Sequence, residues 1–303
     1  MGSAGAAGAA TLTVANNGGK YSLSFGQTYV EIDPAMGARI TALRVGGAAG
    51  MDLIASSTTT GDLDNWGSTF WPSPQSGWTW PPTDTTTSIG AINSSPYTVA
   101  MDASSVSLTS GVAVKPAISV IKKFSADLAK EAIIIDYTIT NGGTAPVNVA
   151  PWEITRVPGG GITFYGTGMD APRAGNFPLP AAATITTGAG ATWYKHDTAD
   201  LTDRKLLADG GGGWLAHAEG DLILVKSFPD VALGAAAPSE AEIEIYASKT
   251  AKYVEIEQQG ALTTMLAPQA ALHWTVRWYV RKLAAPATVG SAELVTYVQN
   301  LIK

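Results

Sequence analysis

The segment that decides the fold class is residues 272–280, Leu-His-Trp-Thr-Val-Arg-Trp-Tyr-Val. Apolar side chains occupy every second position, and His, Thr, Arg and Tyr stand between them. Successive side chains of a β-strand point to opposite faces, so this spacing gives one apolar face and one more polar face. The segment is therefore predicted to be a strand of a sheet that buries one face in a core.

The same two-residue period recurs along the chain, with no visible repeat and no composition break that would mark a second domain. Turn residues separate the periodic segments, as at residues 141–143 (Asn-Gly-Gly) and in the glycine runs 159–161 and 210–213, which we interpret as turns. We expect strands at residues 21–25, 29–32, 39–45, 104–108, 133–140, 214–217, 222–226, 242–246, 253–257 and 272–280. This series of short strands predicts an all-β protein.

One helix is expected near the C-terminus. Ser291 is a suitable N-cap, and Glu293 lies in the first turn, where the helix dipole favours an anion. The apolar stripe that would pack on a sheet consists of Leu294, Val295, Val298, Leu301 and Ile302. A strand-rich chain with one terminal helix favours a large antiparallel β-sandwich.

Composition restricts the class of protein. The chain has 303 residues, 46% of them hydrophobic and 15% charged, which fits one large domain over residues 11–303. No apolar run is long enough to cross a bilayer, and a formal charge of −6 opposes binding to nucleic acid. The absence of cysteine excludes disulfides and thiolate metal sites, and no metal-binding or phosphate-loop motif occurs. We therefore expect no cofactor, no metal, no membrane partner and no nucleic-acid partner, and the oligomeric state is left open.

Residues 1–10 begin Met-Gly-Ser and continue with Ala and Gly. They have neither the charged region nor the apolar region of a signal peptide, so we interpret them as an expression remnant joined to a flexible leader. The abundance of Thr, Ser, Ala and Gly, with few charges, is typical of secreted or periplasmic bacterial β-proteins. A periplasmic or secreted location is the resulting hypothesis.

Four tryptophans fall within residues 64–82, Asp-Asn-Trp-Gly-Ser-Thr-Phe-Trp-Pro-Ser-Pro-Gln-Ser-Gly-Trp-Thr-Trp-Pro-Pro. This segment is rich in Pro and Gly, so we expect a rigid loop rather than a strand or a helix. Indole rings beside polar side chains suit a ligand that has both C–H faces and hydroxyls, as a sugar does. The alternative is that the rings only close the edge of a sandwich. The predicted saccharide-binding residues here are Asp64, Asn65, Trp66, Trp71, Gln75, Trp78 and Trp80.

Several segments, in order, resemble the galactose mutarotase-like superfamily. Residues 31–43, Glu-Ile-Asp-Pro-Ala-Met-Gly-Ala-Arg-Ile-Thr-Ala-Leu, resemble its early hairpin, and the tryptophan-rich segment lies where these proteins place a loop at the sugar cleft. Residues 150–156 (Ala-Pro-Trp-Glu-Ile-Thr-Arg), 203–206 (Asp-Arg-Lys-Leu), 213–216 (Gly-Trp-Leu-Ala) and 253–260 (Tyr-Val-Glu-Ile-Glu-Gln-Gln-Gly), with 272–279, are most similar to an uncharacterised family, DUF4380. The resemblance covers residues 25–282 and implies a two-sheet supersandwich with a sugar site on a concave face.

In that superfamily mutarotation uses a Glu base, a His acid and a second His that holds the sugar. Glu257 resembles the base, and alternation places it on one strand face with Tyr253, Glu255 and Gln259. The chain departs from the family pattern at the histidines, because neither family position carries one. We therefore do not expect mutarotation by the Glu/His mechanism. Of the three histidines, His217 and His273 are interpreted as structural and only His196, in a polar segment, is considered for a site.

The remaining candidates are charged side chains among apolar neighbours, where a charge must be paired or functional. Asp64, Glu153, Arg156, Lys205 and Glu257 are expected to face one cleft, with Trp66, Trp71 and the further sugar-binding candidate Trp152. One hypothesis is an epimerase- or lyase-type enzyme that uses Glu257 or Glu153 as base and Arg156 or Lys205 to stabilise negative charge. The alternative is a non-catalytic carbohydrate-binding or structural module, with Glu257 on a solvated face and Glu153 simply paired, for example with Lys205.

Overall fold

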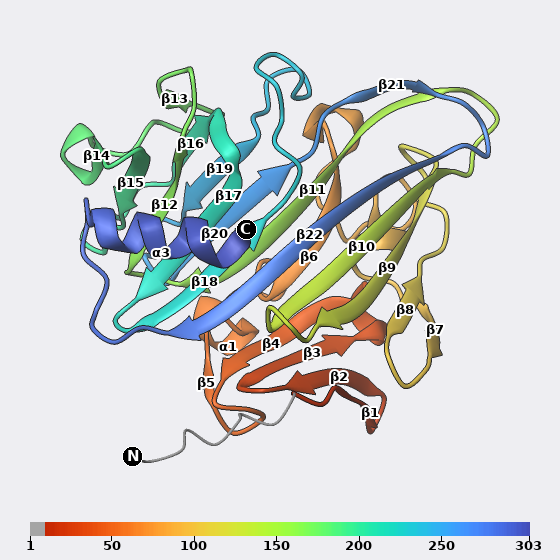
Figure 1. Ribbon diagram of the computed structural model, residues 1–303. Coiled ribbons are helices and arrows are strands. Elements are labelled where there is room, and N and C mark those ends of the chain that lie inside the picture. Colours follow the sequence, from red (N-terminus) through yellow and green to blue (C-terminus); the bar gives the residue numbers. More distant parts are fainter. Residues whose placement is uncertain (1–9) are drawn as a thin grey trace.

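Two large antiparallel sheets, packed face to face, form the framework of residues 10–303, the part of the chain that the computed structural model describes (Figure 1). Strands make up 47% of these described residues. The all-β prediction is therefore confirmed. The predicted leader lies outside the described residues, apart from residue 10. In this described part, no helix combines the length and the apolar character that a membrane crossing requires.

The first sheet has twelve strands within residues 10–303, and its β5 and β21 are short additions to β4 and β11. Its main order is β1 (Thr13–Asn17), β2 (Lys20–Phe25), β3 (Thr28–Asp33), β4 (Arg39–Val45), β6 (Ser68–Ser73), β11 (Val147–Pro158), β20 (Tyr253–Gln259), β19 (Ile243–Ala247), β16 (Arg204–Ala208) and β13 (Arg173–Ala174), with β5 at Met51–Asp52 and β21 at Thr263–Leu266.

The second sheet has ten strands within the same residues. Its order is β14 (Ile185–Gly188), β15 (Ala191–Lys195), β12 (Ile162–Thr167), β17 (Gly210–Glu219), β18 (Leu222–Ser227), β22 (Ala271–Lys282), β10 (Ala132–Asn141), β9 (Ile118–Asp127), β8 (Val106–Thr109) and β7 (Thr98–Met101). The short helix α1 (Ser57–Thr60) lies between β5 and β6 of the first sheet, and α2 (Gly90–Asn93) lies in the connection from β6 to β7, which leads from the first sheet to the second.

The main core lies between the two sheets. Strand β22, which carries the alternation of residues 272–280, buries Trp274, Val276, Trp278 and Val280 there. The helix α3 (Ala292–Ile302) lies across the other face of the ten-stranded sheet (Figure 1). As predicted, the Ser291 hydroxyl accepts the Leu294 N–H at 3.1 Å and the apolar stripe is turned to the sheet.

Two predictions of local structure were wrong. The tryptophan-rich segment contains a fully buried strand, β6, instead of being loop throughout. Pro72 of β6 lies opposite Pro151 of β11, so two residues that have no backbone N–H to donate face each other in the sheet. The glycine run 210–213 also belongs to a strand, β17. Proline and glycine content misled the prediction at both places.

Candidate functional site

A cavity of about 770 Å³ lies on the face of the twelve-stranded sheet that is turned away from the other sheet. Six neighbouring strands contribute to it, in the order β6, β11, β20, β19, β16 and β13, together with the loops that follow β6 and β13. The lining side chains with polar or aromatic groups are Asn65, Trp71, Gln75, Ser76, Trp80, Trp152, Arg173, Asn176, Phe177, Lys205, Ser239, Glu240, Glu244, Tyr246, Tyr253 and Glu255.

Strand register brings these side chains together. On the cavity side, Trp71 of β6 is the partner of Trp152 of β11. Farther along β11, one row of Cα partners crosses four neighbouring strands, Arg156, Glu255, Tyr246 and Lys205. Side chains directly opposite each other in antiparallel strands point to the same face, so Glu255, Tyr246 and Lys205 form the floor of the cavity and Arg156 lies directly behind it.

Three indole rings form one wall. Trp71 is the centre, with ring centroids 5.3 Å from Trp152 and 6.1 Å from Trp80, both edge to face. The Trp71 N–H donates to the Asn93 side-chain oxygen at 2.7 Å, which fixes the ring. Trp71 and Trp152 are nearly buried, whereas Trp80 is 57% exposed. Trp80 thus offers an aromatic surface at the cavity that rests on a rigid support.

Lys205 lies at the centre of a buried charged group, which we call the cavity cluster: Lys205, Glu244, Glu257 and Trp152. The Lys205 ammonium is 2.8 Å from Glu244 Oε2 and 2.6 Å from Glu257 Oε1, and it lies 5.6 Å from the centre of the Trp152 ring. Trp152 Nε1 donates to Glu257 Oε2 at 2.9 Å. Both oxygens of Glu257 are therefore occupied, while Lys205 still lines the cavity.

The charges in the cavity cluster depend on one another. Burial on its own would lower the pKa of Lys205, but the carboxylates of Glu244 and Glu257 outweigh burial and hold that pKa above its ordinary value. Burial raises the pKa of Glu244 and of Glu257, and Lys205 opposes both shifts. The cluster therefore keeps an ammonium charged at the cavity wall in a place with little water.

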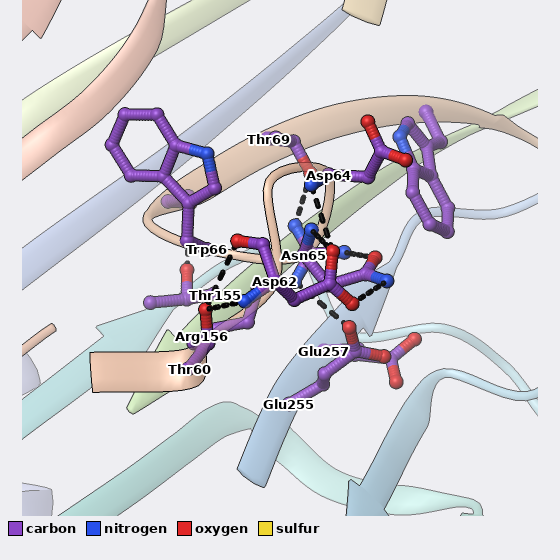
Figure 2. Close-up of polar contacts among 12 residues, drawn as sticks. Thr60, Asp62, Asp64, Asn65, Trp66, Thr69, Thr155, Arg156, Glu255 and Glu257 are labelled. Carbon is purple, nitrogen blue, oxygen red and sulfur yellow. Dashed lines mark hydrogen bonds and ion pairs between the residues drawn. The ribbon is translucent and has the colours of Figure 1, made fainter. Parts of the chain in front are cut away.

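A second ion pair lies on the same floor. Figure 2 shows Arg156 between Glu255 and the loop that carries Asn65. Arg156 Nε donates to Glu255 Oε1 at 2.8 Å, Nη1 to Thr69 at 2.6 Å and Nη2 to Asn65 Oδ1 at 3.2 Å. Asp62 in turn accepts from the Asn65 side chain at 3.0 Å. No hydrogen bond from residues 10–303 reaches Oε2 of Glu255, and this residue lines the cavity.

The opposite wall is also aromatic. Phe177, 36% exposed, packs on Tyr246 with ring centroids 5.5 Å apart, and Tyr246 lies 6.2 Å from Tyr253. The Tyr246 hydroxyl donates to Asp203 at 2.6 Å, which fixes that ring. Glu240 joins this side to the tryptophan side, because its carboxylate accepts the Gln75 N–H at 2.8 Å.

The structure divides the residues predicted from sequence into three groups. Those that line the cavity are Asn65, Trp71, Gln75, Trp80, Trp152 and Lys205. Two lie directly behind the lining and bind to it, Arg156 and Glu257. Four do not line it, Asp64, Trp66, Trp78 and Glu153.

Glu153 requires the main correction. It points from β11 to the space between the sheets, so it does not share a cleft with Glu257, and its partner is Lys226 at 3.0 Å rather than Lys205. The physical reason is strand alternation: Glu153 follows Trp152 directly, so the two side chains leave opposite faces of the sheet. Sequence reasoning placed both on the same side.

The other three residues that do not line the cavity, Asp64, Trp66 and Trp78, make contacts within the tryptophan-rich segment and with Arg39 of β4. Trp66 lies under the Arg39 guanidinium, 4.7 Å from its ring centre, and donates to the Leu63 carbonyl. The Asp64 carbonyl accepts from the same arginine at 2.9 Å. Trp78 is buried and donates to the Pro72 carbonyl at 2.8 Å. Of these three residues, Trp78 contacts the cavity wall, because its ring lies edge to face with that of Trp71.

Sequence reasoning missed several lining residues. Glu255 stands on the same strand face as Glu257, so the alternation of residues 253–257 gave a usable signal for it. Glu244 and Tyr246 are two residues apart on β19, so alternation places them on the same strand face, but the sequence analysis did not name Glu244 as a site candidate. Phe177 and Arg173 lie in a segment without periodicity, and no local signal in the sequence points to them.

The histidines lie elsewhere, and none of them lines the cavity. His217 is buried and pairs with Thr163, His196 accepts the Gly160 N–H at 2.7 Å, and His273 pairs with Thr138. Burial lowers the pKa of His217 to about 3. Within the described part of the chain, no group of three or more His, Cys, Asp or Glu side chains is arranged to hold a metal ion.

Comparison with known proteins supports the fold. No family model matches this chain, and no characterised protein matches it by sequence. Among solved structures, a galactose mutarotase related enzyme from Lactobacillus acidophilus superposes with a TM-score of 0.59 at 9% identity, over 89% of this chain and 100% of that one. A galactose mutarotase-like protein from Lactobacillus casei gives 0.56 at 11% identity, over 89% and 100%.

A TPR-domain containing protein from Parabacteroides distasonis gives a TM-score of 0.57 at 10% identity; the match covers 86% of this chain and 46% of that protein, so this chain spans about half of its length. The finer resemblance to DUF4380 stays a prediction. Two large antiparallel sheets, the terminal helix and these neighbours together identify the fold as the galactose mutarotase-like sandwich.

Proposed function

We propose that this protein binds a saccharide in the cavity over the twelve-stranded sheet. The observation that carries the proposal is the arrangement of the cavity itself, where a floor of charged donors and acceptors lies between aromatic walls. Sugar hydroxyls bind to such polar groups and sugar C–H faces pack on aromatic rings. Lys205 and Arg156 already face carboxylates, so we expect a neutral saccharide. The carbohydrate-related fold of the structural neighbours agrees with this proposal.

A screen of neutral glycans, followed by tryptophan fluorescence and calorimetry, tests the proposal. Trp80→Ala should weaken binding by about 1–3 kcal/mol, because an exposed aromatic surface at the cavity is lost. Trp66→Ala is the matched control, since Trp66 comes from the same segment but does not line the cavity. The proposal fails if no glycan binds, or if Trp66→Ala weakens binding as much as Trp80→Ala does.

Proton transfer on the bound sugar is a second candidate function, and one observation favours it. Glu255 lines the cavity with one oxygen held by Arg156 and the other without a partner in residues 10–303, so it has the free acceptor that a general base needs. Glu257, the base predicted from sequence, has both oxygens occupied. We therefore transfer the role of base to Glu255, with the Lys205 ammonium as the group that stabilises developing negative charge.

Nuclear magnetic resonance of the sugars found in the screen tests this candidate through epimerisation or bond cleavage. Glu255→Gln should stop turnover and keep affinity within a few fold, because the amide preserves the shape of the site. If no sugar is converted by the parent protein, the non-catalytic binding function is the one that stands.

A further inference from the structure

We infer that the ligand is an oligosaccharide that extends across the strands, and not a single sugar. This inference rests on the proposed saccharide binding and specifies its substrate class. It begins with the size of the cavity, about 770 Å³, which lies in the upper part of the range for cavities that enclose drug-sized ligands. A single hexose would leave most of this volume to water.

The second observation is that the cavity has two exposed aromatic rings, each supported by another ring. Trp80 packs on Trp71, and Phe177 packs on Tyr246. Trp80 and Phe177 are 57% and 36% exposed, both line the cavity, and each contacts its supporting ring. Rings held in this way are preformed surfaces for the C–H face of a sugar, one on each wall.

The distance between the two supports decides how many sugar units fit. Trp71 is on β6 and Tyr246 on β19, three strand steps apart in the sheet order β6, β11, β20, β19. At about 4.8 Å per step, the two strands lie roughly 14 Å apart. One pyranose ring is smaller than this strand separation, so we expect a single sugar to contact one of the two exposed rings. Two outer units can each lie on one aromatic ring, with a unit between them over the polar floor.

The polar floor fits a central unit. Lys205 and Glu255, which line the cavity, come from strands β16 and β20. The Lys205 ammonium has two carboxylate partners in residues 10–303 and three N–H groups, and Glu255 has one oxygen without a partner there. One donor and one acceptor are thus available between the aromatic walls for hydroxyls of the central sugar.

Calorimetric titration with a length series tests the inference without any substitution. Glucose, galactose and their β-linked and α-linked di-, tri- and tetrasaccharides are compared on the full chain. Affinity should rise about tenfold or more from the monosaccharide to the trisaccharide and then change little. A monosaccharide that binds as tightly as its trisaccharide overturns the inference and leaves saccharide binding intact.

Phe177→Ala separates the two walls. It should remove most of the gain from the longer oligomers and leave monosaccharide affinity within about twofold, because a single unit placed at the tryptophan wall does not contact Phe177. Tyr297→Ala is the matched control, since Tyr297 is 38% exposed on α3, far from the cavity. Equal weakening of all lengths by Phe177→Ala overturns the two-wall arrangement, and failure of every saccharide to bind overturns the proposed function as well.

Discussion

Two Glu–Lys clusters lie on opposite faces of the twelve-stranded sheet, and they differ in how completely their atoms are used. In the inner cluster, between the sheets, Lys226 donates to Glu153, Thr155 and Gln258, which uses all three ammonium hydrogens. Glu153 also accepts from Tyr137 at 2.6 Å and from Trp278 at 2.9 Å. In the cavity cluster, Lys205 has two partners within residues 10–303 and lines open space.

The comparison separates a structural charge from a functional one. A buried ion pair whose donors and acceptors are all hydrogen-bonded has no free group that could bind a ligand. The inner cluster is of this kind, and its hydrogen bonds join β10, β18 and β22 to β11 and β20. A buried pair with a donor left over beside a cavity keeps a directional site for a ligand, at a cost in desolvation. Both clusters contain Lys, Glu and Trp side chains, so residue type alone does not distinguish the structural cluster from the functional one.

Breaking the inner cluster should give the largest effect on stability. Lys226→Met leaves the Glu153 carboxylate buried without its cation, which should lower the free energy of unfolding by about 3–5 kcal/mol. Urea denaturation measures the change. A loss below about 1 kcal/mol would show that the inner cluster is not the structural one.

Opening the cavity cluster should cost less. Glu257→Gln keeps the side-chain shape, and Lys205 keeps Glu244 as a partner, so we expect a loss of about 1–3 kcal/mol. Glu255→Gln is the matched variant on the cavity wall, and its loss should be smaller, since one oxygen of Glu255 is hydrogen-bonded whereas both oxygens of Glu257 are. If Glu257→Gln destabilises as much as Lys226→Met, the two clusters do not differ in the way described above.

The sequence predicted the positions of the strands better than the tertiary contacts of individual side chains. Alternation located strands such as β4, β10, β20 and β22, because side-chain period is a local property. It also placed Glu257 on one face with Glu255. Alternation also separates Glu153 from Trp152 and Arg156, a signal that the prediction did not use; which of the two faces meets the second sheet is decided by tertiary packing. Phe177 joins the site through a long irregular connection, and such tertiary placement leaves no periodic signal.

The smallest effect concerns the outer support of Arg156. Although burial on its own would raise the pKa of Asp62, hydrogen bonds from Asn65 and from backbone N–H groups outweigh it and hold that pKa below its ordinary value of 3.8. The carboxylate therefore contributes stability above about pH 3.8 that is lost as the pH falls through the lower folded pKa. Saccharide affinity should decline slightly in the same range as Asn65 loosens, and Asp62→Asn should flatten the decline. If saccharide affinity of Asp62→Asn declines at low pH as it does in the parent protein, Asp62 does not support the site through Asn65.

The central claim is that the open cluster, not the saturated one, is the ligand site. A crystal structure of the protein with the tightest-binding neutral oligosaccharide tests it most directly. We expect the sugar chain between Trp80 and Phe177, with hydroxyls hydrogen-bonded to the Lys205 ammonium and to Oε2 of Glu255. A sugar chain bound at another surface, with the cavity containing only water, would contradict it.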